Sequence, residues 1–335
     1  MNERKSLFSP TRRAFVGGMV ALSIPSIART GTDASIVARL DFSPWGLHSA
    51  MHLASVKGWF KDEGLSVDVQ DGRGSSNTLQ LVNAGQADIG QVSLGLLPQA
   101  RGNGATVKAI AGWERANDLA VLVDKDSPIQ EAADFEGKKI VVFAASLWAP
   151  FVDLWLQRGG LDRSKVEVMF VDPTALWSTY TSGRVDGIMT TPPSVMPAAE
   201  GVRPSKAIHA SDAGLVVPSF GLIASEAMLS KRPEVVKAFT RVQVKTWDYI
   251  RSGNVDEAVA ATIQQRPDTK LDPKILSGQL RLALEYFDTP STKGKPTGWQ
   301  SEDDWAAAIS TMKEAGVIKN EAATSDFYTN DFLPS

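Results

Sequence analysis

One pattern occurs twice in the chain, as Ala84-Gly85-Gln86-Ala87-Asp88-Ile89 and as Ser182-Gly183-Arg184-Val185-Asp186-Gly187-Ile188. Each copy follows a β-branched run and a helical stretch, which predicts a unit of strand, helix and strand. Gly85 and Gly183 stand where the helix would end, in the left-handed conformation that glycine adopts easily. The repeat therefore predicts an α/β fold with two similar lobes and mainly parallel sheets.

The same alternation continues outward from both copies and defines the predicted organisation of the chain. A fresh strand follows the turn at Pro128, and the chain is expected to return near residues 218–223, so it crosses twice between the lobes. Lobe 1 is thus predicted to be discontinuous, with residues 34–125 and 219–335, while lobe 2 comprises residues 126–218 and a two-strand hinge joins them. Predicted strands cover residues 35–40, 66–70, 87–91, 107–111, 139–143, 166–171 and 185–189, and predicted helices begin near Leu47, Ser76, Leu94, Ala149, Thr174 and Ser194.

The composition excludes several classes of function. The chain has 335 residues, 43% of them hydrophobic and 22% charged, which is typical of a soluble protein that buries sizeable cores. A net charge of −3 argues against a nucleic-acid-binding protein. Since cysteine is absent, thiol nucleophiles, thiolate zinc sites, disulfides and a lipidated N-terminal cysteine are excluded. With only three histidines and no nucleophile elbow, we predict no catalytic residues, no metal and no cofactor.

Residues 1–28 have the features of an export signal. Basic residues, among them Arg12 and Arg13, precede an apolar run over residues 14–28 that is too short and too broken by glycine and proline to span a membrane. Ser26 and Ala28 form the small-x-small pattern of a cleavage site, and the arginine pair resembles a twin-arginine signal. We therefore predict cleavage near Ala28 and a location in the periplasm.

The candidate ligand site lies at the loops that follow strands, where open α/β sheets bind ligands. The first strand of each predicted lobe leads into a similar loop, residues 41–48 and 144–151, and each loop carries a tryptophan, Trp45 or Trp148. Two lobes facing each other would place these rings on opposite walls of a cleft, where they can stack on a planar solute. Trp113 and Trp177 occupy comparable loops, where packing between elements is an equal alternative to ligand contact.

Polar residues at the same strand ends complete the predicted site. Gly74 and Ser75 open a helix whose free amides favour an anion or an oxygen acceptor, with simple helix capping as the alternative. Ser93, Ser146 and Thr191 follow other strands and are similar candidates. His48 is predicted to contact the ligand as a neutral imidazole, and His52, four residues on, to pack within its helix. Among the arginines, Arg115 is the better candidate for an anionic group, ahead of Arg73 and Arg184.

Several fragments in order resemble a known family. They are Asp41-Phe42-x-Pro44-x-x-x-His48, Gly58-Trp59-Phe60-x-x-Glu63-Gly64-Leu65, Gly74-Ser75-Ser76, Gly85-x-Ala87-Asp88 and Gly183-x-Val185-Asp186. In them the chain resembles the periplasmic substrate-binding proteins of ABC importers, specifically the nitrate/sulfonate/taurine type that also includes binders of thiamine pyrimidine precursors. The resemblance implies the type II periplasmic-binding fold, closure of two lobes around a small solute, and a membrane permease and ATPase as partners of a monomer.

The enzymatic branch of that family is the main alternative. Its members carry a cysteine-rich motif and a Gly-Glu-Phe-Gly phosphate loop, whereas this chain has no cysteine and has Ser146–Phe151 in the corresponding loop. We therefore predict a binding protein and no enzyme, for a heteroaromatic, pyrimidine-like or aromatic acid solute. A sulfonate, taurine or nitrate binder of the same family remains the second interpretation, and an exported relative of the pyrimidine-precursor synthases the third.

Overall fold

The computed structural model describes residues 33–144, 146–318 and 322–334. Residues 33–335 form one compact unit, and the predicted export signal, residues 1–28, lies outside the described residues. Within the described part of the chain, none of the helices combines the length and apolar character needed to cross a membrane.

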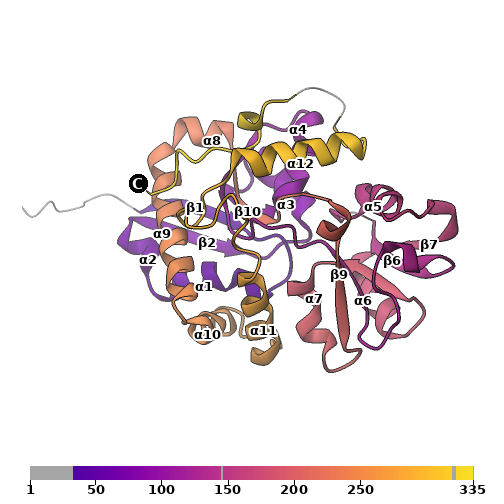
Figure 1. The fold of residues 1–335 in the computed structure, drawn as a ribbon. Coiled ribbons are helices and arrows are strands. Elements are labelled where there is room, and N and C mark those ends of the chain that lie inside the picture. The colour runs from indigo at the N-terminus through magenta and orange to yellow at the C-terminus, as the bar shows by residue number, and fades with distance from the viewer. Residues whose placement is uncertain (1–32, 145, 319–321, 335) are drawn as a thin grey trace, which may run out of the picture. The chain divides into compact units, whose positions relative to one another are not determined.

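Two five-stranded sheets with the same strand plan form the two lobes (Figure 1). In each sheet three parallel strands are followed by one antiparallel strand that comes from another part of the chain. The first sheet has the order β2 (Leu65–Gln70), β1 (Ala34–Arg39), β3 (Ile89–Ser93), β10 (Phe220–Ser225) and β4 (Val107–Gly112). The second has the order β7 (Glu167–Val171), β6 (Lys139–Phe143), β8 (Gly187–Thr190), β5 (Ala120–Asp124) and β9 (Ser205–His209).

The helices divide between the lobes in the way that the repeat predicts. Gly85 and Gly183, which follow α3 and α6, have φ angles of 70° and 74°, the left-handed geometry expected of both. The helices of lobe 1 are α1 (Ser49–Val56), α2 (Trp59–Asp62), α3 (Ser75–Asn83), α4 (Leu97–Gly102), α8 (Glu226–Lys231), α9 (Pro233–Arg251), α10 (Val255–Gln265), α11 (Pro273–Leu284) and α12 (Glu302–Glu314), and those of lobe 2 are α5 (Val152–Arg158), α6 (Pro173–Thr181) and α7 (Pro192–Ala199).

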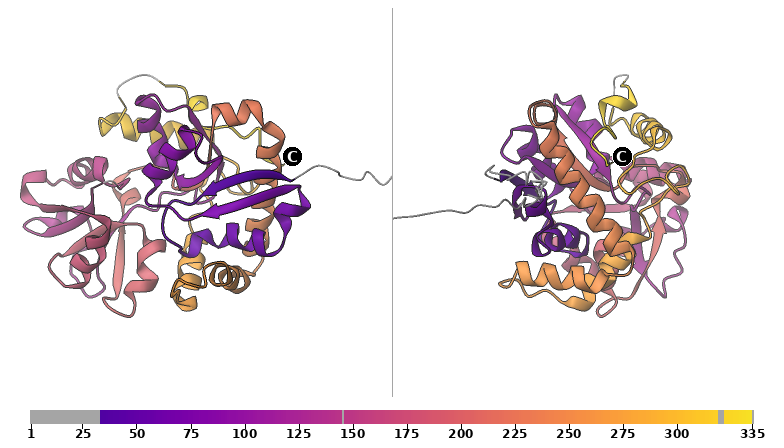
Figure 2. Two further views of the ribbon diagram at one scale, coloured as in Figure 1. Left: turned by 180° about the vertical axis from the view of Figure 1, so that it is seen from behind. Right: turned by 90° about the vertical axis from the view of Figure 1, so that its left-hand side faces the viewer.

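The C-terminal helices complete the core of lobe 1. Helix α9 begins with Pro233 in its first turn, where a missing backbone N–H costs nothing, and buries Val236, Phe239, Trp247 and Ile250 on one face. The views of Figures 1 and 2 agree that α9, α10 and α11 lie together on the lobe 1 side, away from β6, β7 and β9. Lobe 1 therefore needs both of its chain segments to bury its apolar surface.

The chain crosses between the sheets at residues 113–119 and 210–219, which we call the two crossing segments. The sequence boundary at residue 125 assigned residues 120–124 to lobe 1. In the structure these residues form β5, which pairs with β8 and β9 in the second sheet. The first crossing thus comes earlier than predicted, because β5 carries no helix after it that would mark it as a strand of lobe 2.

Candidate functional site

A cavity of about 440 Å³ lies between the two lobes and is lined from both of them. Its walls come from the loops after β1, β2, β3, β6 and β8, as expected for the carboxyl ends of strands in α/β sheets. Eight of the ten residues predicted for the site line it together, namely Trp45, Gly74, Ser75, Ser93, Ser146, Trp148, Trp177 and Thr191. The other two, His48 and Trp113, do not line it.

Two glycines allow the lobe 1 loops to approach one another closely. A Cβ atom on Gly72 would lie 2.0 Å from the Leu40 carbonyl oxygen, so only glycine fits there. Gly74 has a φ angle of 115°, which side chains disfavour, and its amide donates to the Asp41 carbonyl oxygen at 2.6 Å. The loop after β2 is thereby tied to the loop after β1, and α3 begins at Ser75 beside the cavity.

Asp41 is the charged residue that sequence reasoning did not select. It follows β1, lines the cavity, and its Oδ1 atom is 2.7 Å from His48 Nε2. His48 itself is fully buried behind the loop, so it orients the carboxylate and does not reach a ligand. The structure thus places His48, predicted as a ligand contact, outside the cavity lining, with its ring against Asp41. An acidic residue at a strand end with a histidine seven positions later was the signal that could have identified the pair.

The hydroxyl groups of the cavity differ in what they can still bond. Ser75 Oγ accepts from the Ser93 backbone N–H at 3.0 Å, so its own proton stays available to a ligand. Thr191 Oγ1 and Ser194 Oγ are 2.8 Å apart, and Ser194 Oγ also donates to the Thr191 carbonyl. Thr191 then donates to Ser194 and keeps acceptor capacity. The buried Ser146 Oγ has no hydrogen-bond partner among the described residues.

The aromatic residues differ in how much of each ring is accessible. Trp148 is only 1% exposed, because its ring packs edge-on against Trp155 and its indole N–H donates to the Thr190 carbonyl at 3.0 Å. Trp148 lines the cavity, but it leaves little ring surface accessible. Trp177 is half-buried, and Phe42 is 42% exposed. Phe143 lines the cavity as well and is also half-buried, so the rings of Phe42, Phe143 and Trp177 are accessible aromatic surfaces of the site.

Trp113 and Arg115 lie elsewhere and have structural surroundings. The Trp113 ring is fully buried in lobe 1, 6.0 Å from the ring of Trp247. The Arg115 guanidinium donates to three carbonyl oxygens, those of Phe287, Pro296 and Trp299, and pairs with Asp288. With these partners Arg115 joins loops of lobe 1, and it does not line the cavity between the lobes.

Gln279 on α11 joins the two lobes at the edge of the cavity. Its Oε1 accepts from the Gly46 backbone N–H at 2.9 Å, and its Nε2 donates to the Ser194 carbonyl of α7 at 2.8 Å. Sequence reasoning missed Gln279, since nothing local marks a helical glutamine that lies 233 positions from Gly46. The bond to Ser194 thus joins the two lobes, and α7 and α11 are in contact.

The chemistry of the cavity follows from its lining. Among the lining residues, all of which the structure describes, Asp41 carries the sole formal charge, and no lysine, arginine or histidine is present. Arg73 and Arg184 are exposed and outside the lining. Within the described residues, no group of three histidine, aspartate or glutamate side chains is arranged to hold a metal ion. The site can therefore accept hydrogen bonds at Asp41 and contact apolar surface on both lobes.

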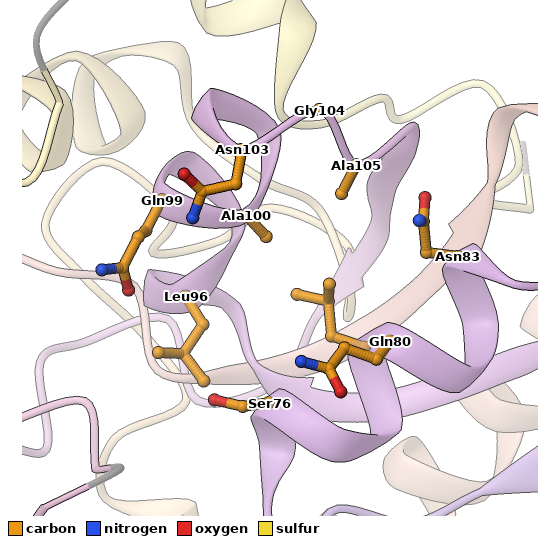
Figure 3. A pocket seen from close by; sticks show the side chains of 10 residues that line it. Ser76, Gln80, Asn83, Leu96, Gln99, Ala100, Asn103, Gly104 and Ala105 are labelled. Carbon is orange, nitrogen blue, oxygen red and sulfur yellow. The ribbon is translucent and has the colours of Figure 1, made fainter.

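A second cavity, of about 330 Å³, lies beside α3 and α4. Figure 3 shows that Gln80 and Asn83 of α3, Gln99 of α4 and Asn103 just after α4 surround it. These carboxamides are exposed, and Asn83 Oδ1 already accepts from the Thr106 backbone N–H. Since this cavity lacks charged and aromatic side chains, we take the cavity between the lobes as the candidate site.

Comparison with known proteins agrees with this arrangement. A family model described as NMT1/THI5 like matches residues 45–253. The riboflavin-binding protein RibY of Chloroflexus aurantiacus is 23% identical over 321 residues, covering 92% of this chain and 87% of RibY. The formylaminopyrimidine-binding protein of Halalkalibacterium halodurans is 23% identical over 306 residues, covering 88% of this chain and 90% of that protein.

A solved structure shows the same fold. The periplasmic aliphatic sulphonate-binding protein SsuA of Escherichia coli aligns with a TM-score of 0.68 at 15% identity, over 87% of this chain and 91% of SsuA. The predicted fold class, two similar α/β lobes of the periplasmic-binding type, is thereby confirmed.

Proposed function

We propose that this chain, which belongs to the NMT1/THI5-like family, is an exported solute-binding protein for a small aromatic compound. The observation that carries the proposal is the cavity between the lobes, with accessible aromatic rings and one carboxylate. The protein would capture its solute as a monomer in the periplasm, after cleavage near Ala28, and present it to the permease and ATPase of an ABC importer.

The class of solute follows from the lining. Asp41 accepts hydrogen bonds and carries a negative charge, so it favours a solute with N–H donors and a neutral or positive charge. A sulfonate, nitrate or carboxylate would face this carboxylate without any basic side chain in the lining to pair with it. The names of RibY and the formylaminopyrimidine-binding protein, which are those of heteroaromatic binders, support the same class.

The ring faces and hydroxyls supply the remaining contacts. Trp177 and Phe42 would contact the faces of a planar ring, while Ser75 donates to a carbonyl or ring nitrogen of the solute. In the closed arrangement the solute contacts both lobes, whereas in the open one it contacts a single lobe. It therefore binds the closed arrangement more tightly and shifts the equilibrium toward closure. Trp45 and Trp148 line the same cavity, and Trp148 also packs on Trp155 in the core of lobe 2.

A thermal-shift screen of the purified protein tests this proposal. The panel contains aminopyrimidines, riboflavin, aromatic amines, aromatic acids, taurine, an alkanesulfonate and nitrate. A compound present at about 100 times its Kd stabilises the folded state by about 2.7 kcal/mol, which such a screen detects. We expect the response from a heteroaromatic compound with N–H groups.

Matched variants locate the binding. Trp177→Ala should weaken the response, whereas Trp59→Ala should not, because Trp59 is also half-buried but packs on Tyr249 outside the cavity. Stabilisation by taurine or nitrate alone would overturn the proposed solute class. Turnover of any panel compound would instead favour the enzymatic alternative.

A further inference from the structure

Two carboxyl groups are buried in the first crossing segment without a cation to pair with. Glu114 and Asp118 are 0% and 1% exposed. Within the described residues, Glu114 Oε1 and Asp118 Oδ2 have no hydrogen-bond partner. Ser219, in the second crossing segment, is a side-chain hydrogen-bond partner of both carboxyls, and its Oγ donates to Glu114 Oε2 over a long 3.5 Å. The pair thus lies where the two crossing segments touch.

The groups around this pair do not neutralise it. Asp41 is itself acidic, and its charge raises the pKa of both carboxyls. It is hydrogen-bonded to His48. Tyr286 faces the pair from the segment after α11, and its ring lies 6.2 Å from that of His209. Two more groups, Arg115 and Asp304, line a small cavity together with Glu114, but the Arg115 guanidinium is held by Asp288 and by backbone carbonyls.

Burial makes ionisation of the pair costly. It raises the pKa of Glu114 well above its ordinary value, with the charges of Asp118 and Asp41 acting in the same direction. Burial also raises the pKa of Asp118 to about 7. Burial and the two nearby carboxyls raise the pKa of Tyr286, so its phenol stays neutral. The buried pair therefore holds a proton that two carboxylates in water would release.

We propose that opening of the lobes hydrates Glu114 and Asp118 and releases a proton, so that the cleft closes more readily under acidic than under alkaline conditions. This inference concerns regulation of the same cleft and rests on the proposed function. Movement of one lobe against the other must change the backbone of both crossing segments, which the Glu114–Ser219 contact joins. With the lobes closed, the carboxyls are buried and their pKa is higher, so the closed arrangement binds protons more tightly. The closed arrangement therefore loses stability relative to the open one as pH rises through about 7.

Distance measurements between spin labels test the proposal without any solute. Because the chain has no cysteine, Asn77→Cys on α3 and Thr174→Cys on α6 give one exposed label on each lobe. Between about pH 5.5 and about pH 8.5, a range that spans the expected titration, the distance distribution should shift toward longer distances. The added Glu114→Gln and Asp118→Asn substitutions should remove this shift. Asp268→Asn, an exposed carboxyl between α10 and α11, should leave it unchanged.

Two results would overturn the inference. One is a distribution that is the same at both pH values in the otherwise wild-type protein, a result that does not depend on how any carboxyl variant folds. The other is an unchanged shift in the doubly substituted protein, or in each single variant if circular dichroism shows that the double one is unfolded. Since no solute is added, either result leaves the solute screen, and hence the proposed function, to stand or fall separately.

Discussion

The two walls of the cleft share one strand plan but differ in chemistry. The lobe 1 wall carries the charged Asp41, the polar Ser75 and Gln279, and aromatic rings such as that of Phe42. The lobe 2 wall offers Leu176, Trp177 and other apolar or aromatic side chains, with four hydroxyl residues, Ser146, Thr190, Thr191 and Ser194. Strand order decides where the loops lie, and loop sequence decides what they present. We therefore expect Asp41 on the lobe 1 wall to orient the solute, and the lobe 2 wall, together with Phe42 of lobe 1, to supply apolar contact.

The two walls are also supported differently from behind. In lobe 1 the polar side chains of His48 and His52 are buried on and before α1, next to the Asp41 loop. In lobe 2 aromatic rings fill the same role, since Trp148 packs on Trp155, and Trp155 on Phe135. Substitutions behind the lobe 2 wall should therefore affect stability, and those at the lobe 1 surface should affect affinity.

The largest expected effect is on the stability of lobe 2. Trp148→Ala removes a fully buried ring and leaves the Thr190 carbonyl without its indole donor. We expect the free energy of unfolding to fall by about 3–5 kcal/mol, as for other large aromatic-to-alanine changes in cores. Urea denaturation followed by circular dichroism measures it. Trp177→Ala in the same lobe should cost clearly less, and equal losses would contradict the distinction between a supporting and a surface tryptophan.

The sequence predicts the position of the cleft well because strand ends are local features. The repeated glycines locate the ends of helices. A residue at the end of a strand, such as Ser93, or just after one, such as Thr191, must lie at the carboxyl edge of its sheet. For this reason most predicted site residues line one cavity.

The direction of a side chain and its contacts with residues distant in sequence could not be predicted from local sequence patterns. His48 and Trp148 both sit in loops that line the cavity, yet one turns toward Asp41 and the other packs into the core of its lobe. Gln279 reaches the site only because α11 packs against the 3-10 helix that contains Gly46. Each of these outcomes depends on tertiary packing, which a local pattern does not encode.

Asp41→Asn should produce the largest loss of affinity. The change keeps the shape of the side chain but removes the charge that accepts a hydrogen bond from the solute. Hydrogen bonds to charged groups contribute about 1.5–3 kcal/mol, so Kd should rise about 10- to 100-fold for a solute with N–H donors. Isothermal titration calorimetry with the compound identified by the screen measures this. Asp68→Asn, an exposed carboxyl on β2, is the matched control, and equal affinity in both variants would show that Asp41 does not contact the solute.

Substitution of His52 should have a smaller effect, on the free energy of unfolding and on how that free energy depends on pH. Both ring nitrogens are buried with no partner among the described residues, and burial, together with Arg266 and His48, lowers the pKa of His52 to about 3. The folded protein thus keeps this imidazole neutral, and stability is lost as pH falls below 6.5 toward 3, because the unfolded chain takes up the proton.

His52→Leu should remove this loss and the unsatisfied polar atoms. We expect a gain of about 1 kcal/mol in the free energy of unfolding near neutral pH, and a larger gain under acidic conditions. Thermal unfolding as a function of pH measures it. His209→Leu, at a histidine that is only half-buried, should leave the acid-side loss in place. A pH profile of His52→Leu that parallels the wild type would show that His52 is protonated or paired in the folded protein.

Trp177→Ala should have the smallest of these effects, because it removes a contact that the solute makes in addition to its burial. Trp177 is half-buried at the lobe 2 wall, and its ring is tilted 45° from that of Tyr180. A well-placed aromatic pair contributes about 0.5–1.5 kcal/mol, so Kd should rise about 2- to 10-fold, with little change in Trp177→Phe. Titration of the compound identified by the screen, followed by calorimetry, measures both variants. If Trp177→Ala weakened binding more than Asp41→Asn, the lobe 2 wall would decide which solute binds, and the roles assigned to the two walls would have to be exchanged.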